Sequence, residues 1–151
     1  MLNLEGLRAN LGELWIPDIY ISDVRSMRTR RMAMAIPERE NSPDILHTLL
    51  GVELKVGKLR IACPDLSTAR YLMVFARIGC RDIAVPYDIT KISKIADDLE
   101  TAWQRLNLIL EGASVRTRNK AIRLVRDEIA SAGSSAAAPE FKQTTKQRGR
   151  C

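Results

Sequence analysis

Apolar and polar residues alternate from Gly51 to Cys63, on both sides of the pair Gly57-Lys58. Alternation with a period of two is typical of strands with one buried face, and glycine suits the first position of a two-residue turn that requires a positive φ. This stretch is therefore predicted to form a β-hairpin. Its register would place the apolar side chains in three cross-strand pairs on one face, Val56 with Leu59, Leu54 with Ile61, and Val52 with Cys63.

A helix is predicted directly after this hairpin, from Leu66 to Ile78. Pro64-Asp65 ends the second strand and begins the helix, and Gly79 stands where glycine commonly ends one. Residues 81–87 then have the composition of a short strand. When two strands of one sheet are joined by a crossover helix, they form a right-handed parallel unit. We therefore expect one β-α-β unit, with the hairpin extending its sheet.

The N-terminal third of the chain carries weaker patterns. Leucines at mixed spacings predict a short, imperfect helix within residues 1–14. Residues 15–22 favour a strand or an extended edge, because Pro17 cannot donate a hydrogen bond inside a sheet. Residues 32–37 alternate and predict a further strand. The sequence Ser42-Pro43-Asp44 is typical of a helix start and predicts a helix of about two turns, which ends at the glycine that opens the hairpin.

The longest predicted element is an amphipathic helix from about Ile89 to Glu111, with apolar residues at intervals of three and four. A helix of this length spans about 33 Å, whereas a five-residue strand covers about 17 Å, so its last turns extend beyond a short sheet. The helix predicted from Val115 to Ser131 can cover part of that stretch. The uncovered part predicts a self-association surface with Trp103, Leu106 and Leu110 as interface candidates.

Together these elements predict an α/β or α+β fold. It contains a small mixed sheet with a β-hairpin and one right-handed β-α-β unit, followed by the long amphipathic helix and a second C-terminal helix. A chain of 151 residues can bury the core of one domain, which we expect over residues 1–133. Residues 134–151 lack periodicity and are expected to form a disordered, basic tail. The sequence shows no signal peptide and no apolar run of about 18 residues, so a cytoplasmic protein without membrane contact is expected.

The net charge of +6 suggests an anionic partner, but half of it lies in the tail. Four of the 24 basic residues and one of the 18 acidic residues follow residue 133, so tail and body each carry +3. A first basic group precedes the strand predicted at residues 32–37: Arg25, Arg28, Arg30 and Arg31. A candidate nucleic-acid-binding face lies on one side of the last helix: Arg116, Lys120, Arg123 and Arg126. Aromatic residues at 5% leave little for base stacking, which argues against sequence-specific binding of single strands.

Three residues in and before the hairpin resemble the pattern of metal-dependent nucleases in which an Asp and a Glu-x-Lys meet on neighbouring strands. Glu53 and Lys55 share one face of a predicted strand, and Asp44 precedes them in the chain. In that pattern the carboxylates hold Mg²⁺ and the lysine helps to activate water. Two observations weigh against it. Asp44 stands in a predicted helix start, and any solvated strand face produces Glu-x-Lys by alternation.

Other catalytic patterns are weaker. Cys63 and Arg70 stand where a strand meets a helix, as in phosphatases of the Cys-x5-Arg type, but six residues separate them and Asp65 would repel phosphate. His47, the only histidine, lies in the predicted short helix, where a surface or half-buried role is expected. No cluster of Cys and His predicts a metal site, and no cofactor is expected.

The sequence therefore ranks three functions without identifying one. The first is a non-catalytic interaction or regulatory module of the cytoplasm, which forms a homodimer through the helix at residues 89–111. The second is a nucleic-acid-associated protein that binds phosphates through the basic helix face and the tail. The third is a metal-dependent nuclease that uses Asp44, Glu53 and Lys55.

Overall fold

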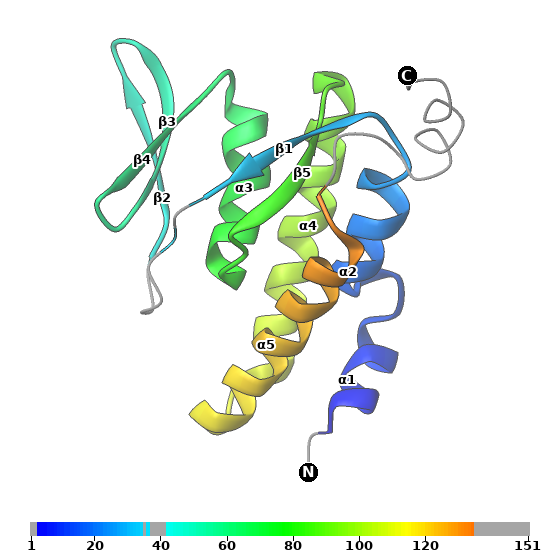
Figure 1. Ribbon diagram of the computed structural model, residues 1–151. Helices are drawn as coiled ribbons and strands as arrows, with labels where there is room; N and C mark the ends of the chain where they lie inside the picture. Colours follow the sequence, from blue (N-terminus) through cyan, green and yellow to red (C-terminus); the bar gives the residue numbers. More distant parts are fainter. Residues whose placement is uncertain (1–2, 35, 37–41, 135–151) are drawn as a thin grey trace.

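The computed structural model describes residues 3–34, 36 and 42–134 (Figure 1). The N-terminal part holds the helices α1 (Leu4–Leu11) and α2 (Ile16–Ile19), the 3-10 turn η1 (Gly12–Leu14) and the π turn η2 (Tyr20–Val24). The strands are β1 (Thr29–Ala33), β2 (Asp44–Thr48), β3 (Gly51–Val56), β4 (Leu59–Cys63) and β5 (Asp82–Pro86). The longer helices are α3 (Leu66–Ile78), α4 (Ile89–Leu110) and α5 (Val115–Ala132).

The mixed α/β class is confirmed, but the strands form two small sheets. One sheet pairs β1 with β5, the other has the order β2-β3-β4, and every pair is antiparallel. The predicted parallel β-α-β unit is therefore wrong, because β4 and β5 flank α3 in the chain but belong to different sheets. The physical reason lies at β5. One of its edges pairs with β1, and side chains close the other.

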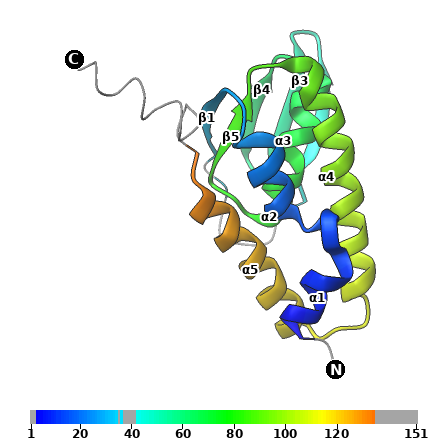
Figure 2. The ribbon, with the colours of Figure 1, turned by 90° about the vertical axis from the view of Figure 1, so that its right-hand side faces the viewer.

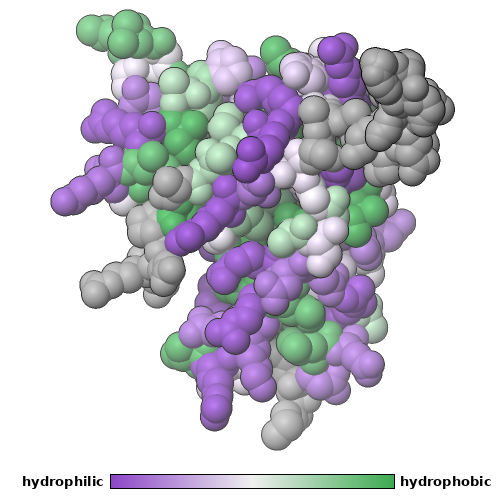
Figure 3. Space-filling view, viewed as in Figure 1, coloured by the Kyte–Doolittle hydropathy of each residue, from purple (hydrophilic) through white to green (hydrophobic). Residues whose placement is uncertain are grey.

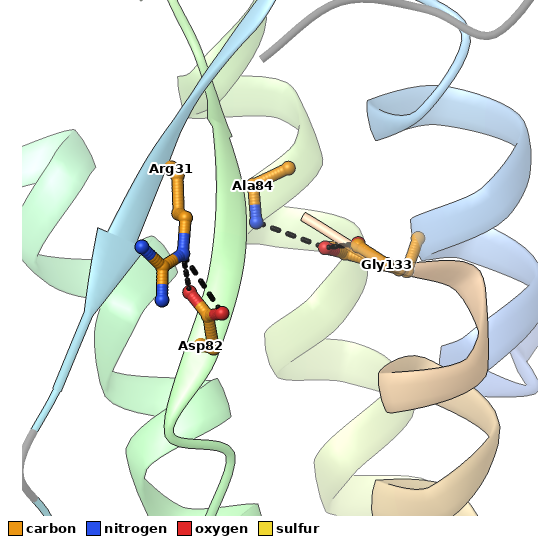
Figure 4. Close-up of polar contacts among 5 residues, drawn as sticks. Arg31, Asp82, Ala84 and Gly133 are labelled. Atoms are coloured by element: carbon orange, nitrogen blue, oxygen red, sulfur yellow. Dashed lines mark hydrogen bonds and ion pairs between the residues drawn. The ribbon is translucent and has the colours of Figure 1, made fainter. Parts of the chain in front are cut away.

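Two tyrosine hydroxyls close that second edge of β5. The hydroxyl of Tyr71 donates to the carbonyl oxygen of Ala84 at 2.6 Å, and the N–H of Ala84 donates to the hydroxyl of Tyr20 at 2.9 Å. Tyr20 in turn donates to the carbonyl oxygen of Gly133 at 2.6 Å, which links β5 to the end of α5 (Figure 4). Burial raises the pKa of both tyrosines, so their hydroxyls stay protonated as donors. Neither backbone group of Ala84 is left for another strand.

The hairpin of β3 and β4 is confirmed together with its register, Val56 with Leu59, Leu54 with Ile61, and Val52 with Cys63. Gly57 in the turn has a φ of +62°, the conformation that favours glycine. The apolar face of the hairpin packs against α3, where Leu54 and Val56 are fully buried. The local alternation of the sequence was therefore sufficient to define this element.

Residues 15–22 form helical turns and not the predicted strand. The buried apolar residues of this region recur at helical intervals: Ile16, Ile19, Tyr20 and Val24. Pro17 occupies the first turn of α2, where the missing N–H costs no hydrogen bond. Ile21, which would alternate with Ile19 in a strand, is exposed. Burial along the helical stripe thus decides against the extended form.

The helix predicted to start at residues 42–44 is also wrong, because Asp44–Thr48 is strand β2 and pairs antiparallel with β3. Proline is tolerated at the first position of a strand as well as in the first turn of a helix, so Pro43-Asp44 suits both. The hairpin decides between them. It offers the edge of β3 for pairing, and a five-residue segment gains ladder hydrogen bonds there, whereas an isolated short helix is marginal.

The other predicted elements differ from the observed ones mainly at their ends. The short N-terminal helix exists as α1, and the strand predicted over residues 32–37 begins earlier, at Thr29, as β1. Residues 35 and 37, and all of the predicted tail except Ser134, lie outside the described residues. Within the described ranges, no helix is both long and apolar enough to cross a membrane.

Helices α3, α4 and α5 are confirmed, and each begins at a side chain that accepts a backbone hydrogen bond. The accepting residues are Asp65 (from Thr68, 2.8 Å), Asp88 (from Thr90, 3.0 Å) and Ser114 (from Thr117, 3.1 Å). Gly79 ends α3 in the left-handed conformation, with a φ of +95°. These caps are local signals, which explains why the sequence predicts the three helices to within about two residues.

Two of the three interface candidates predicted on α4 are wrong, because Leu106 is 1% exposed and Leu110 is 2% exposed within a single chain. Trp103 is half-buried. Helices α1, α2 and α3 all pack against α4, and Leu7 and Leu11 of α1 belong to the same core. Figure 2 shows α1 lying between the lower parts of α4 and α5. Nothing in the sequence of α1 indicates which face of α4 it covers, so the stripe looks unprotected until the chain is folded.

Candidate active site on the open face of the three-stranded sheet

The antiparallel register of β2 and β3 brings the Asp and the Glu-x-Lys pair together. Asp44 stands directly opposite Lys55, and Leu46 stands opposite Glu53. Directly opposite residues share a face with Cβ atoms about 5 Å apart, and diagonal neighbours two positions along lie about 7–8 Å apart. Asp44, Glu53 and Lys55 therefore occupy one face of two adjacent strands. The objection that Asp44 begins a helix no longer holds, because it begins β2.

This face of the sheet is open to solvent. The opposite face carries Leu54 and Val56, which are buried against α3. On the open face Asp44 and Lys55 are exposed, and the side chain of Glu53 retains 24% of its exposure. Figure 1 shows α3 on one side of the sheet and no described element over the other. A large molecule can therefore reach all three residues.

The third strand adds Arg60 to the same face. Arg60 stands opposite Lys55, and its Nη1 lies 3.3 Å from Oε1 of Glu53. A row that crosses the three strands thus presents an acid, a lysine and an arginine, with the second acid beside them. The hairpin register predicted from the sequence already implies that Arg60 faces Lys55. This residue was missed only because the nuclease pattern names Asp, Glu and Lys.

The two carboxylates are oxygen ligands of the kind that Mg²⁺ prefers. Asp44 accepts a hydrogen bond from the N–H of Ile45 at 3.0 Å, and Glu53 contacts Arg60, so neither is locked in a buried network. In the described part of the chain no group of three or more His, Cys, Asp or Glu side chains could hold a metal ion. A cation here would be held by two carboxylates, water and substrate oxygens. Mg²⁺ is bound by proteins in this way, whereas structural zinc and calcium sites need more protein ligands.

The other catalytic candidates of the sequence are kept apart from this face. His47 is exposed on the opposite face of β2. Cys63 is buried, and burial raises the pKa of its thiol, which disfavours the thiolate that a nucleophile needs. Arg70 donates to Glu100 of α4 at 2.7 and 3.0 Å and also contacts Asp97. Cysteine and arginine therefore do not form a phosphatase-like site.

The N-terminal arginine group is divided among separate contacts and does not form one basic patch. Arg25 is nearly buried, and its Nε donates to the carbonyl oxygen of Ala132 at 3.1 Å, at the end of α5. Arg31 of β1 binds both carboxylate oxygens of Asp82 on β5, at 2.8 and 2.9 Å (Figure 4). The guanidinium of Arg28 lies over the ring of Tyr87. The structure thus uses at least Arg25 and Arg31 for packing and strand pairing.

The basic face of α5 is reduced to three residues, because Arg126 is structural. Its Nε donates to the carbonyl oxygen of Ile78 at 3.0 Å, and its guanidinium lies against Gly79. It thereby satisfies a terminal carbonyl of α3. The remaining candidates are exposed and form no ion pair with a described residue: Arg116, Lys120 and Arg123. Figure 3 shows a mainly hydrophilic surface over α5.

Comparison with known proteins adds no relative to this picture. No family model, no curated protein and no solved structure matches the chain. The interpretation of the open sheet face therefore rests on the register, exposure and chemistry of Asp44, Glu53, Lys55 and Arg60.

Proposed function

We propose that the protein is a metal-dependent nuclease whose active site is the open face of β2 and β3. The observation that carries the proposal is the register of these strands, which puts Asp44 opposite Lys55 and diagonal to Glu53 on an uncovered face. A phosphodiester in a long chain is a suitable substrate, because a nucleic-acid strand can lie across an open sheet. The basic Lys55 and Arg60 favour its phosphates electrostatically.

Each residue of the face has a role in this proposal. Asp44 and Glu53 would hold Mg²⁺, which when bound would supply positive charge to the phosphate and lower the pKa of a bound water. Lys55 donates hydrogen bonds that orient the attacking water. Arg60 leaves Glu53 and binds a phosphate oxygen. The water oxygen bonds to phosphorus and its proton passes to solvent, while the bond from phosphorus to one ester oxygen breaks and that oxygen takes up a proton.

The expected result with the intact protein is cleavage of nucleic acid that requires a divalent cation. We would incubate it with plasmid DNA, labelled single-stranded DNA and labelled RNA, in Mg²⁺ or Mn²⁺ and in EDTA. Products should form with the cations and be absent in EDTA. If none of the three substrates is cut with either cation, the proposed function is overturned.

A second candidate function is binding of nucleic acid without sequence preference. It is favoured by the exposed basic side chains of α5. Replacing Arg116, Lys120 and Arg123 by alanine should weaken binding equally for all sequences. The slope of log affinity against log salt should also flatten, by about 0.7–0.9 for each phosphate that the variant no longer neutralises. Filter binding at several salt concentrations measures both quantities. Unchanged affinity in the triple variant would remove α5 from the binding surface.

The self-associating module that ranks first on the sequence loses its main support, because Leu106 and Leu110 are buried in one chain. Self-association through another surface stays a prediction. The most exposed apolar side chains of the described residues are Leu49 and Leu50, in the turn between β2 and β3. Figure 3 shows this turn as a hydrophobic projection at the upper left.

A further inference from the structure

A hollow of about 400 Å³ lies between the start of β1 and the start of α4, away from the proposed active face. It is lined by Met27, Arg28, Tyr87, Asp88 and Lys91. The junction of β5 and α4, which carries Tyr87 and Asp88, lies in the upper part of the molecule in Figure 1. The hollow thus combines an aromatic ring with two basic side chains.

Strand pairing places the aromatic ring beside an arginine. The N–H of Tyr87 donates to the carbonyl oxygen of Arg28 at 3.3 Å, which continues the antiparallel ladder of β1 and β5 by one residue pair. The guanidinium carbon of Arg28 lies 5.0 Å from the centroid of the Tyr87 ring. Arginine planes and aromatic rings both stack on nucleobases. The pair therefore brings together two groups that can each stack on a base.

Tyr87 differs from the other two tyrosines of the chain. Tyr20 and Tyr71 are fully buried, and their hydroxyls bond to the backbone of β5. Tyr87 is 53% exposed, and its hydroxyl makes no hydrogen bond with a described residue. The contact of its ring with a described residue is the guanidinium of Arg28, and about half of the side chain stays open to solvent.

The remaining polar groups of the hollow place a phosphate beside the stack. Asp88 accepts from the N–H of Thr90 at 3.0 Å and from its hydroxyl at 2.6 Å, so its carboxylate caps α4. These hydrogen bonds, above all the one from the Thr90 hydroxyl, lower the pKa of Asp88, so its carboxylate stays charged. The negative charge repels an anion from the N-terminus of α4. Arg28 and Lys91 are then the groups of the hollow that can receive a phosphate.

We propose that this hollow binds one unpaired nucleotide of a nucleic-acid strand, with the base stacked on the Tyr87–Arg28 pair and a phosphate held by Arg28 and Lys91. The class of ligand rests on the proposed nuclease function. An unpaired nucleotide is required, because bases inside a duplex already stack on each other. Stacking reads no base edge, so the site is expected to have no sequence preference.

The test compares Tyr87→Ala with Tyr87→Phe, which keeps the ring. Binding of labelled oligothymidylate of about 12 nucleotides, and of a duplex of equal length, is measured by fluorescence anisotropy in EDTA, where no metal-dependent cleavage occurs. Tyr87→Ala should weaken single-strand binding by about 10-fold with an unchanged salt slope, and Tyr87→Phe should bind like the parent. Lys91→Ala should flatten the salt slope by about 0.7, the value for one phosphate of a single strand.

Two outcomes overturn the inference: a parent that does not bind the single strand, or a Tyr87→Ala variant that binds it as the parent does. An equal loss on duplex and single strand would also contradict it, because the base would not need to be unpaired. The result is independent of cleavage. If the parent binds the single strand through Tyr87 but cleaves no substrate, the nucleotide site is supported and the nuclease function is overturned. If the parent cleaves nucleic acid but Tyr87→Ala binds the single strand as the parent does, the nuclease function is supported and the nucleotide site is overturned.

Discussion

Replacing Glu53 by glutamine is expected to lower the rate of metal-dependent cleavage by about 100-fold or more. The amide keeps the shape of the side chain but removes one of the two negative charges that would hold Mg²⁺ on the open face. The fold should persist, since Glu53 is partly exposed and its contact within the described residues is the surface pair with Arg60. Such surface pairs contribute about 0–1 kcal/mol, so the melting temperature should stay within a few degrees of the parent.

The matched control is Asp98→Asn, which removes a carboxylate of similar exposure on α4 that pairs with Lys94 at 3.1 Å. Its cleavage rate should equal that of the parent. Asp44→Asn should lose activity that rises again with Mg²⁺ concentration, because it weakens metal binding. Lys55→Ala should lose activity that added Mg²⁺ does not restore. Initial rates over a series of Mg²⁺ concentrations separate these cases, and a Glu53→Gln variant that cuts at the parental rate would rule out this active site.

Replacing Leu106 by glutamate is expected to destabilise the protein by about 4 kcal/mol or more. Leu106 is 1% exposed, so the change removes a buried leucine and places a carboxylate in the hydrophobic core. A loss of this size is a large share of the stability of an ordinary domain. The melting temperature followed by circular dichroism should fall by about 10 °C or more, or the variant should be unfolded.

Leu108→Glu is the matched control for this experiment, because Leu108 lies two residues away on α4 and is 66% exposed. It should change the stability by less than about 0.5 kcal/mol. Sedimentation of all three proteins distinguishes core from interface. A Leu106→Glu variant that stays folded, melts like the parent and sediments as a smaller species would contradict the core assignment and restore the interface.

The elements that the sequence predicts correctly carry their signals within a few residues. The hairpin over residues 51–63 has alternation on both sides of a glycine turn, and α3 has an aspartate at its start and Gly79 at its end. Helices α4 and α5 are long enough for a periodic apolar stripe to be recognised. In each case the local chain contains both the pattern and its ends, so no distant residue is needed to specify it.

Segments of about five residues were wrong or displaced, because their local signals suit more than one conformation. Pro43-Asp44 is compatible with the start of a strand and of a helix, and pairing with β3 selects the strand. The apolar residues between Trp15 and Val24 fit a helix once burial is known, and they fit an extended edge without it. Whichever form gains more hydrogen bonds and more burial from its neighbours is adopted.

The sequence by itself determined that Glu53 and Lys55 share one face of a strand, because side chains alternate along any strand. Only the tertiary structure decided that Asp44 lies opposite Lys55, that Leu106 is buried, and that Arg126 binds the end of α3. These contacts join residues that are distant in the chain or belong to different elements. They depend on which surfaces and strand edges pair with each other in the folded chain. Local periodicity carries no information about that pairing.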